Sequence, residues 1–216
     1  MVVCRGGAEV SSTLAVLANL RQSLQVGAWN VLSRREDDHL SLLSSELKRL
    51  DIGFPALSEV RRPDSGEIMP GGYTSYWSGR SDGSHVQGVA VAVSNKLTPM
   101  TIEVTSVNER IMRRRIRHSW GVISLVSVCA PTEASDLTVK DAFHAMLESV
   151  VDQCPRRDTL LVLGDFNASI GTDRDGYETC VWTVNQKSTQ FLDFARSHGL
   201  RVAGSWFQHP QAHRWT

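Results

Sequence analysis

The sequence has few of the features that identify secreted, membrane-embedded or metal-stapled proteins. Only four of its 216 residues are cysteine, and they form neither a Cys-x-x-Cys pair nor the spacing of a disulfide-rich scaffold. No stretch approaches the roughly 18 consecutive apolar residues of a membrane-spanning helix. We therefore expect reduced thiols and an intracellular protein that does not associate with membranes, with the nucleus and the cytoplasm both open.

An excess of positive charge is absent too. Lysine and arginine number 23, as do aspartate and glutamate, so the formal net charge is zero and no global field draws the chain to nucleic acid. Any affinity for phosphate must then be local. The candidates are Arg34-Arg35, Arg61-Arg62, Arg156-Arg157 and the segment from Arg110 to Arg117, although such runs are commonly solvated surface charge.

Length and composition suit one globular domain. With 41% hydrophobic residues, the chain can bury a sizeable core as a single unit. We expect residues 1–22 to be a variable leader outside the fold and residues 23–216 to form the domain. The apolar run Thr13–Leu20 leaves a secretory signal peptide open, but no small-residue cleavage pattern follows it.

Alternating strands and helices predict an α/β fold with two packed sheets and helices outside them. One helix is expected behind the capping box Ser33–Glu36. A second spans Leu137–Asp152 and is stopped by Pro155, and a third starts at Ser188 and is closed by Gly199. Strands are expected near Gly53–Ser58, Gly88–Val93, Thr101–Val107, Arg110–Arg117 and Gly121–Val128, and two further strands are expected to end in polar residues.

The most informative stretch is Leu160–Asn167, in which four apolar residues run into Gly164, Asp165, Phe166 and Asn167. Such a run predicts a buried strand, and polar groups at the carboxyl end of a buried strand are where α/β folds keep their chemistry. Taken alone, Gly-Asp after a strand is also an ordinary turn.

Two other strand ends carry polar side chains. Asn30 closes a strand that begins near Ser23, and Glu59 closes the short strand that begins at Ala56. Taken alone, Asn30 could be an ordinary turn residue, and Glu59 could be a solvent-exposed charge at a strand end. Together with Asp165 and Asn167 they form the set that a Mg²⁺-dependent phosphodiesterase needs, because Mg²⁺ takes few protein carboxylates and keeps several waters.

In their order, four motifs resemble the endonuclease/exonuclease/phosphatase superfamily, in its apurinic-type retrotransposon endonuclease branch. They are Trp29-Asn30, Ser58–Arg61, Ala130–Thr132 and Gly164–Asn167. The resemblance implies a four-layer α/β sandwich, DNA phosphodiester as the ancestral substrate, and Mg²⁺ as the cofactor, with Mn²⁺ as a substitute.

The same resemblance implies a role for each site residue. Glu59 would bind the metal with Asn30 beside it, and Asp165 would orient or deprotonate the attacking water. Asn167 and Thr132 would donate hydrogen bonds to the phosphate. Thr132 belongs to a loop that reads Tyr-x-Pro-Asn in the family, and here Cys129 replaces the phenol with a thiol.

Other departures leave the activity open. The family's late catalytic Asp and its C-terminal Asp-His pair have no match here, so the resemblance implies an incomplete domain that lacks the last strands. Arg114 falls on an apolar strand face where relatives carry Leu, and Pro55 interrupts the strand before Glu59. Two hypotheses then compete: a weak Mg²⁺-dependent endonuclease, or a catalytically inactive remnant that at most binds a partner. A third, less favoured hypothesis is phosphatase activity on a small phosphoester or a lipid. Exposed sheet edges also predict self-association.

Overall fold

A computed structural model describes residues 2–5, 24–31, 37–69, 71–119, 121–168, 176–180 and 189–206. Several expectations fall on other residues. The capping box Ser33–Glu36, the helix cap Ser188, the doublet Arg34-Arg35 and residues 207–216, where the absence of the last strands was expected, lie outside the described part.

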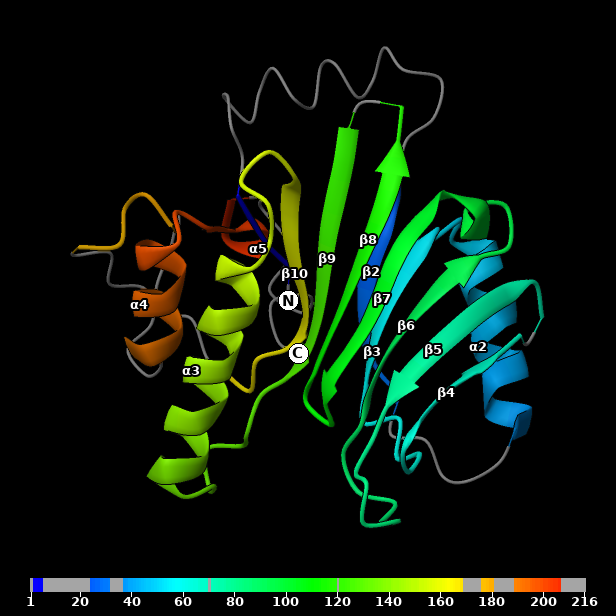
Figure 1. Cartoon of the computed structure of the whole chain (residues 1–216), viewed down its shortest axis with the longest axis horizontal. Coiled ribbons are helices and arrows are strands. Elements are labelled where there is room, and N and C mark those ends of the chain that lie inside the picture. The colour runs from blue at the N-terminus through cyan, green and yellow to red at the C-terminus, as the bar shows by residue number, and fades with distance from the viewer. Residues whose placement is uncertain are drawn as a thin grey trace.

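Two mixed sheets face each other at the centre of the molecule (Figure 1). Sheet A has the order β11 (Arg201–Val202), β1 (Val2–Arg5), β10 (Thr159–Asp165), β9 (Gly121–Cys129), β8 (Ile111–His118) and β7 (Thr101–Asn108). Sheet B has the order β2 (Val26–Asn30), β3 (Phe54–Ser58), β6 (Val89–Ser94), β5 (Tyr73–Ser78) and β4 (Ser65–Ile68). Two neighbouring pairs are parallel, β9 with β10 and β2 with β3, so each sheet brings two strands to a common carboxyl edge.

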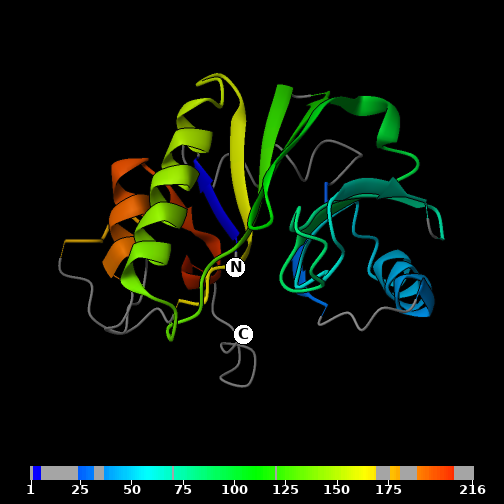
Figure 2. The same cartoon turned by 60° about the horizontal axis from the view of Figure 1, so that its bottom comes forward.

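Helices cover the outer faces of both sheets (Figure 2). Helices α3 (Leu137–Asp152) and α4 (Thr189–Ser197) pack on sheet A, and α2 (Asp37–Arg49) packs on sheet B. The short helix η1 (Thr98–Met100) lies between β6 and β7, and α5 (Ala203–Trp206) directly follows β11. The predicted four-layer α/β sandwich is confirmed.

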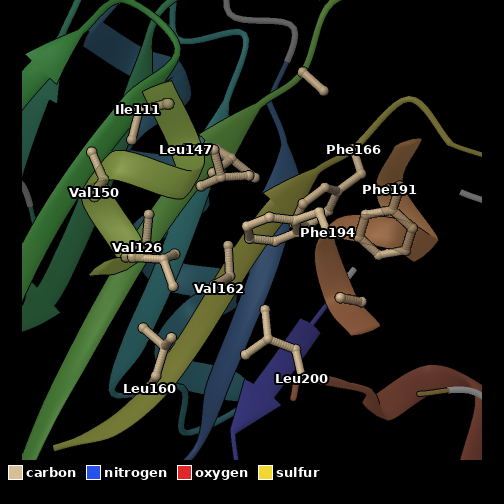
Figure 3. Close-up of a cluster of buried hydrophobic side chains, with 14 of the residues drawn as sticks. Ile111, Val126, Leu147, Val150, Leu160, Val162, Phe166, Phe191, Phe194 and Leu200 are labelled. Atoms are coloured by element: carbon tan, nitrogen blue, oxygen red, sulfur yellow. The ribbon is translucent and has the colours of Figure 1, made fainter. Parts of the chain in front are cut away.

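Three apolar clusters hold these layers together. Between sheet A and its helices, residues such as Leu147, Val162 and Phe194 are almost fully buried (Figure 3). A second cluster fills the space between the two sheets, and a third joins α2 to sheet B through Leu47 and Leu57. Each interface therefore has its own core, which fixes the strand ends relative to one another.

One boundary prediction was wrong. Val2–Arg5, expected in a leader outside the fold, form β1 and pair antiparallel with both β10 and β11. The strand covers the hydrogen-bonding edge that β10 would otherwise expose, which gives these residues a physical reason to join the sheet. Pro55 does not prevent β3 from forming. The residues of β3 that pair with β6 are Ala56–Ser58, so Pro55 lies just before that ladder.

The arginine-rich segment is part of the framework of sheet A. On β8, Arg113 pairs with Glu103 at 2.6 Å, and Arg115 reaches Asp158 at 2.8 Å. Arg114 points to the other side of the strand, toward sheet B, and its side chain is fully buried. The contacts of these three arginines lie within the fold, so the side chains are not arranged as a surface patch for binding phosphate.

Arg114 is incompletely compensated. Its guanidinium lies 4.7 Å from the centre of the Tyr76 ring, and Nη2 donates to the Thr101 hydroxyl. Nε and Nη1 are buried and have no hydrogen-bond partner among the described residues. Burial lowers the pKa of Arg114 to about 10, so the side chain remains charged at neutral pH at a cost in free energy.

We expect Arg114→Met to raise the free energy of unfolding by about 1–3 kcal/mol, because a well-packed apolar residue of similar length removes a poorly paired buried charge. Urea denaturation measures the change. Arg117→Met, at an exposed position of the same strand, is the control and should change stability by less than about 0.5 kcal/mol. A less stable Arg114→Met protein would mean that the contacts with Tyr76 and Thr101 outweigh desolvation.

Asp158 is a buried charge that stabilises the fold, because it is well paired. Its carboxylate accepts hydrogen bonds from Arg115 Nε at 2.8 Å and from Ser124 Oγ at 2.9 Å. Burial alone raises the pKa of Asp158, but these hydrogen bonds outweigh it, so the net pKa is lowered. Because the folded pKa lies below the unfolded one, this stabilisation is present above about pH 4 and is lost as the pH falls further.

Asp158→Asn should therefore lower the free energy of unfolding at pH 7 by about 2–3 kcal/mol. The difference from wild type should shrink below about pH 4. Urea titrations at a series of pH values test both statements. Asp136→Asn, which changes an exposed residue before α3, should behave like wild type; a pH-independent loss in Asp158→Asn would contradict the linkage.

Candidate active site

Asn30 and Glu59 come together because β2 and β3 are parallel and in register. Asn30, the last residue of β2, is level with Ser58, the last residue of β3. The Val31 amide continues the ladder by donating to the Ser58 carbonyl at 3.0 Å. Glu59 follows Ser58 directly, so the Asn30 side-chain amide and the Glu59 carboxylate lie at the same edge of sheet B.

Asp165 arrives at this edge from sheet A. It ends β10 level with Cys129, the last residue of the parallel strand β9. The side-chain amide of Asn30 donates to Asp165 Oδ2 at 3.3 Å, which joins the two sheets across 135 positions of sequence. The carboxyl ends of β2, β3, β9 and β10 therefore meet at one place.

Asn167 completes the turn after β10. Its backbone amide donates to Asp165 Oδ1 at 2.9 Å, and its side-chain amide donates to the Ala130 carbonyl at 2.7 Å. Both oxygens of Asp165 are thus held by donors from Asn30 and Asn167. A carboxylate fixed in this way presents its remaining lone pairs in defined directions.

Left-handed backbone conformations gather at the site. Glu59, Arg61 and Asn167 have φ values of +58°, +53° and +45°. Non-glycine residues rarely adopt this region, and where they do, the surrounding structure must stabilise them. Arg61 is held by its amide, which donates to the Gln87 carbonyl at 2.7 Å, and by His85 Nδ1, which lies 3.1 Å from the Arg61 carbonyl.

Glu59 has two side-chain neighbours that its own strand does not supply. Arg61 Nε lies 3.3 Å from Oε2, and the Cys129 thiol donates to Oε1 at 3.7 Å. Burial and the carboxylates of Glu59 and Asp165 raise the pKa of Cys129 to about 12, so the thiol is neutral. One oxygen of Glu59 therefore faces a cation and the other a weak neutral donor.

Hydrogen bonds join some of the expected site residues and not others among the described residues. Asn30, Glu59, Asp165 and Asn167 share this edge, whereas Thr132 lies exposed in the loop between β9 and α3. Its hydroxyl is 3.2 Å from the Ser135 hydroxyl, within the same loop. Sequence reasoning missed the contact of Arg61 with Glu59, although an arginine two residues after a strand-end glutamate is a signal that could have suggested it.

The donor set suits a hard, largely hydrated cation. Among the described residues no group of three His, Cys, Asp or Glu side chains could enclose a metal ion. Glu59 offers carboxylate oxygens and Asn30 an amide oxygen beside it, and Mg²⁺ requires only one or two carboxylates from protein. Tetrahedral zinc would require several nitrogen or sulfur ligands, and among the described residues only the Cys129 thiol contacts Glu59 at this edge.

Comparison with known proteins identifies the family. Residues 27–215 match the sequence profile of the Endonuclease/Exonuclease/phosphatase family. The chain belongs to this family. Its resemblance to that family, seen first in the strand-end motifs, is confirmed.

The family relatives include craniofacial development protein 2 of Tragulus javanicus and of Bos taurus. They are 24% and 23% identical to the chain over 211 residues, 96% of its length. The match spans 36% and 35% of those proteins, so the chain corresponds to about a third of their length.

Solved structures share the fold of the family. The Xenopus laevis APE2 catalytic domain superposes with a TM-score of 0.54 at 17% identity, covering 81% of this chain and 64% of that one. The endonuclease domain of TRAS1, a telomere-specific non-LTR retrotransposon, superposes with a TM-score of 0.53 at 16% identity. The match covers 81% of this chain and 72% of that one. The AP endonuclease LMAP of Leishmania major superposes with a TM-score of 0.56 at 11% identity, and the match covers 88% of this chain and 78% of that one.

Proposed function

We propose that the chain is a divalent-metal-dependent phosphodiester hydrolase that acts on DNA. The observation that carries this proposal is the hydrogen bond between Asn30 and Asp165, which unites polar strand ends of both sheets beside Glu59. The family and its nuclease relatives support a phosphodiester as the substrate.

Each residue has a role consistent with its contacts. Glu59 would hold Mg²⁺ or Mn²⁺, with Asn30 orienting the carboxylate or a coordinated water. Asp165, held on both oxygens, would orient the attacking water and accept its proton. Asn167 would donate to a phosphate oxygen after exchanging its bond with Ala130, and Thr132 would donate from the neighbouring loop. The bound cation would supply Lewis acidity and stabilise the leaving oxygen.

We further propose that turnover by these 216 residues is slow. Arg61 already neutralises part of the charge on Glu59, so a cation must displace or share that contact. Cys129, where the family has a phenol, is buried and directs its thiol to Glu59. The site therefore has fewer strong donors for a phosphate oxygen than the family pattern implies.

The direct test is nicking of supercoiled plasmid with Mg²⁺ and with EDTA. The proposal expects slow nicking that EDTA abolishes. Nicking that persists in EDTA would contradict it. DNA and Mg²⁺ binding with no nicking would favour a binding protein, and turnover of a small phosphoester but not of plasmid would favour a phosphatase.

Glu59→Gln should weaken Mg²⁺ binding by at least about tenfold, because it removes the charged ligand while preserving shape. Calorimetric titration of the folded protein measures this without relying on activity. Glu46→Gln on α2, whose carboxylate is exposed and pairs with Arg49, is the matched control. Equal Mg²⁺ binding by wild type and Glu59→Gln would exclude Glu59 as the ligand.

Self-association is a further expectation. Among the described strands, β2 ends sheet B and pairs only with β3, so its other edge can accept a strand from a second copy. Light scattering at micromolar concentration should show dimers or larger species, and a monodisperse monomer would refute this.

The compartment is also a proposal. Cys129, Cys154 and Cys180 are buried free thiols, which suits a reducing, intracellular environment. None of the helices in the described part of the chain is long and apolar enough to cross a membrane.

A further inference from the structure

Arg61 occupies one oxygen of Glu59, the proposed metal ligand. Its Nε lies 3.3 Å from Glu59 Oε2, and its terminal guanidinium nitrogens make no hydrogen bond to the part of the chain that the structure describes. An arginine that holds a carboxylate firmly donates two parallel hydrogen bonds to it. The contact between Arg61 and Glu59 is therefore a single, long one that leaves the terminal donors of the guanidinium unused.

The backbone that carries this side chain is fixed by the loop between β5 and β6. The Arg61 amide donates to the Gln87 carbonyl at 2.7 Å, and His85 Nδ1 lies 3.1 Å from the Arg61 carbonyl oxygen. A Cβ added to Gly79 would lie 1.7 Å from the Arg62 carbonyl oxygen, so the two loops pack backbone against backbone. A rearrangement of Arg61 is thus confined to its side chain.

The side chain itself faces solvent. Its exposed fraction is 40%, and that of the Glu59 side chain is 24%. Ion pairs this exposed are weak, because water competes for both charges. A guanidinium also matches the oxygens of a phosphate as well as it matches those of a carboxylate. Arg61 can therefore exchange Glu59 for a phosphate without any change in the backbone.

We propose that Arg61 couples the binding of the divalent cation to the binding of the phosphate. The inference rests on the proposed function and deepens it. In the free protein Arg61 contacts Glu59 and opposes the cation. When a phosphodiester is present, the terminal nitrogens of Arg61 donate to its oxygens, and the Glu59 carboxylate becomes available. Each ligand then raises the affinity for the other by the same factor, as thermodynamic linkage requires.

The test is calorimetric titration of Mg²⁺ into the full chain, with and without dimethyl phosphate, a phosphodiester that has neither base nor sugar, at constant ionic strength. Wild type should bind Mg²⁺ about three- to fivefold more tightly with dimethyl phosphate, the range that a partly exposed ion pair can contribute. Arg61→Gln should bind Mg²⁺ more tightly than wild type by a similar factor without dimethyl phosphate, and should gain little when it is added. Arg61→Lys, which keeps the charge, should retain part of the coupling.

Arg62→Gln is the matched control, because it removes the same charge one residue away, from a guanidinium that lies 5.1 Å from the centre of the Trp77 ring. It should keep the wild-type Mg²⁺ affinity and coupling, and circular dichroism checks that each variant is folded. Mg²⁺ binding by wild type that dimethyl phosphate does not strengthen would overturn the proposal. Full coupling in Arg61→Gln would overturn it too, because the cation and the phosphate would then attract each other directly.

The same measurements separate this proposal from the proposed function. Coupling that depends on Arg61, in a protein that fails to nick plasmid, would contradict the proposed function and leave the coupling standing. EDTA-sensitive nicking by a wild type that shows no coupling would do the reverse.

Discussion

Asp165→Ala is expected to lower the rate of Mg²⁺-dependent plasmid nicking by about 10²- to 10⁴-fold, the range over which a positioned general base contributes. The carboxylate is held by the Asn167 amide at 2.9 Å and by the Asn30 side chain at 3.3 Å, so its remaining lone pairs have a fixed direction. Alanine removes both the proton acceptor and the group that orients water. Mg²⁺ affinity should change little, because Glu59 remains.

Gel-based nicking with equal amounts of folded protein measures the effect. Asp136→Ala, which alters an exposed carboxylate at the start of α3, controls for the loss of one negative charge and should nick like wild type. Wild-type nicking by Asp165→Ala would remove Asp165 from the mechanism.

Gly164→Ala is expected to lower the free energy of unfolding by at least about 3 kcal/mol. Gly164 has φ near +141°, and a Cβ there would lie 2.0 Å from the Val128 carbonyl oxygen of the neighbouring strand. Strain in this backbone region costs about 1–3 kcal/mol, and relieving the overlap must displace β9 or β10 at further cost. Because Asp165 is the next residue, the site should be disturbed as well.

Gly121→Ala provides a close control. Gly121 has φ near +134° but no atom within 4 Å of its added Cβ, so the variant reports the backbone strain without the overlap. Urea denaturation should show Gly164→Ala to be less stable than Gly121→Ala by about 2 kcal/mol or more. Equal destabilisation would mean that the close approach to Val128 relaxes freely.

Local patterns were sufficient for the regular elements. Helix α3 was predicted at Leu137–Asp152 and occurs there, because its apolar residues recur at helical spacing and Pro155 prevents continuation. Strand β1 was missed because four residues near the start of the chain carry little periodic signal. Its place is determined by the edge of β10, which is a property of the tertiary structure.

The candidate site was predictable to a similar degree. Motifs at strand ends indicated Asn30, Glu59, Asp165 and Asn167, and parallel pairing explains why they meet. The spacing of Arg61 after Glu59 could suggest their contact, but its geometry depends on the left-handed conformations of both residues, which the spacing does not specify. The exposed loop position of Thr132 likewise follows from how its loop folds.

The central claim is that strand ends from both sheets form one metal-dependent site, and paramagnetic NMR tests it most directly. Mn²⁺ titrated into the ¹⁵N-labelled chain should first broaden the amide signals of Asn30, Glu59, Asp165 and Asn167, and Glu59→Gln should suppress that broadening. Broadening centred elsewhere, for example on the exposed carboxylates Glu148 and Asp152 of α3, with the four signals unchanged, would contradict the account.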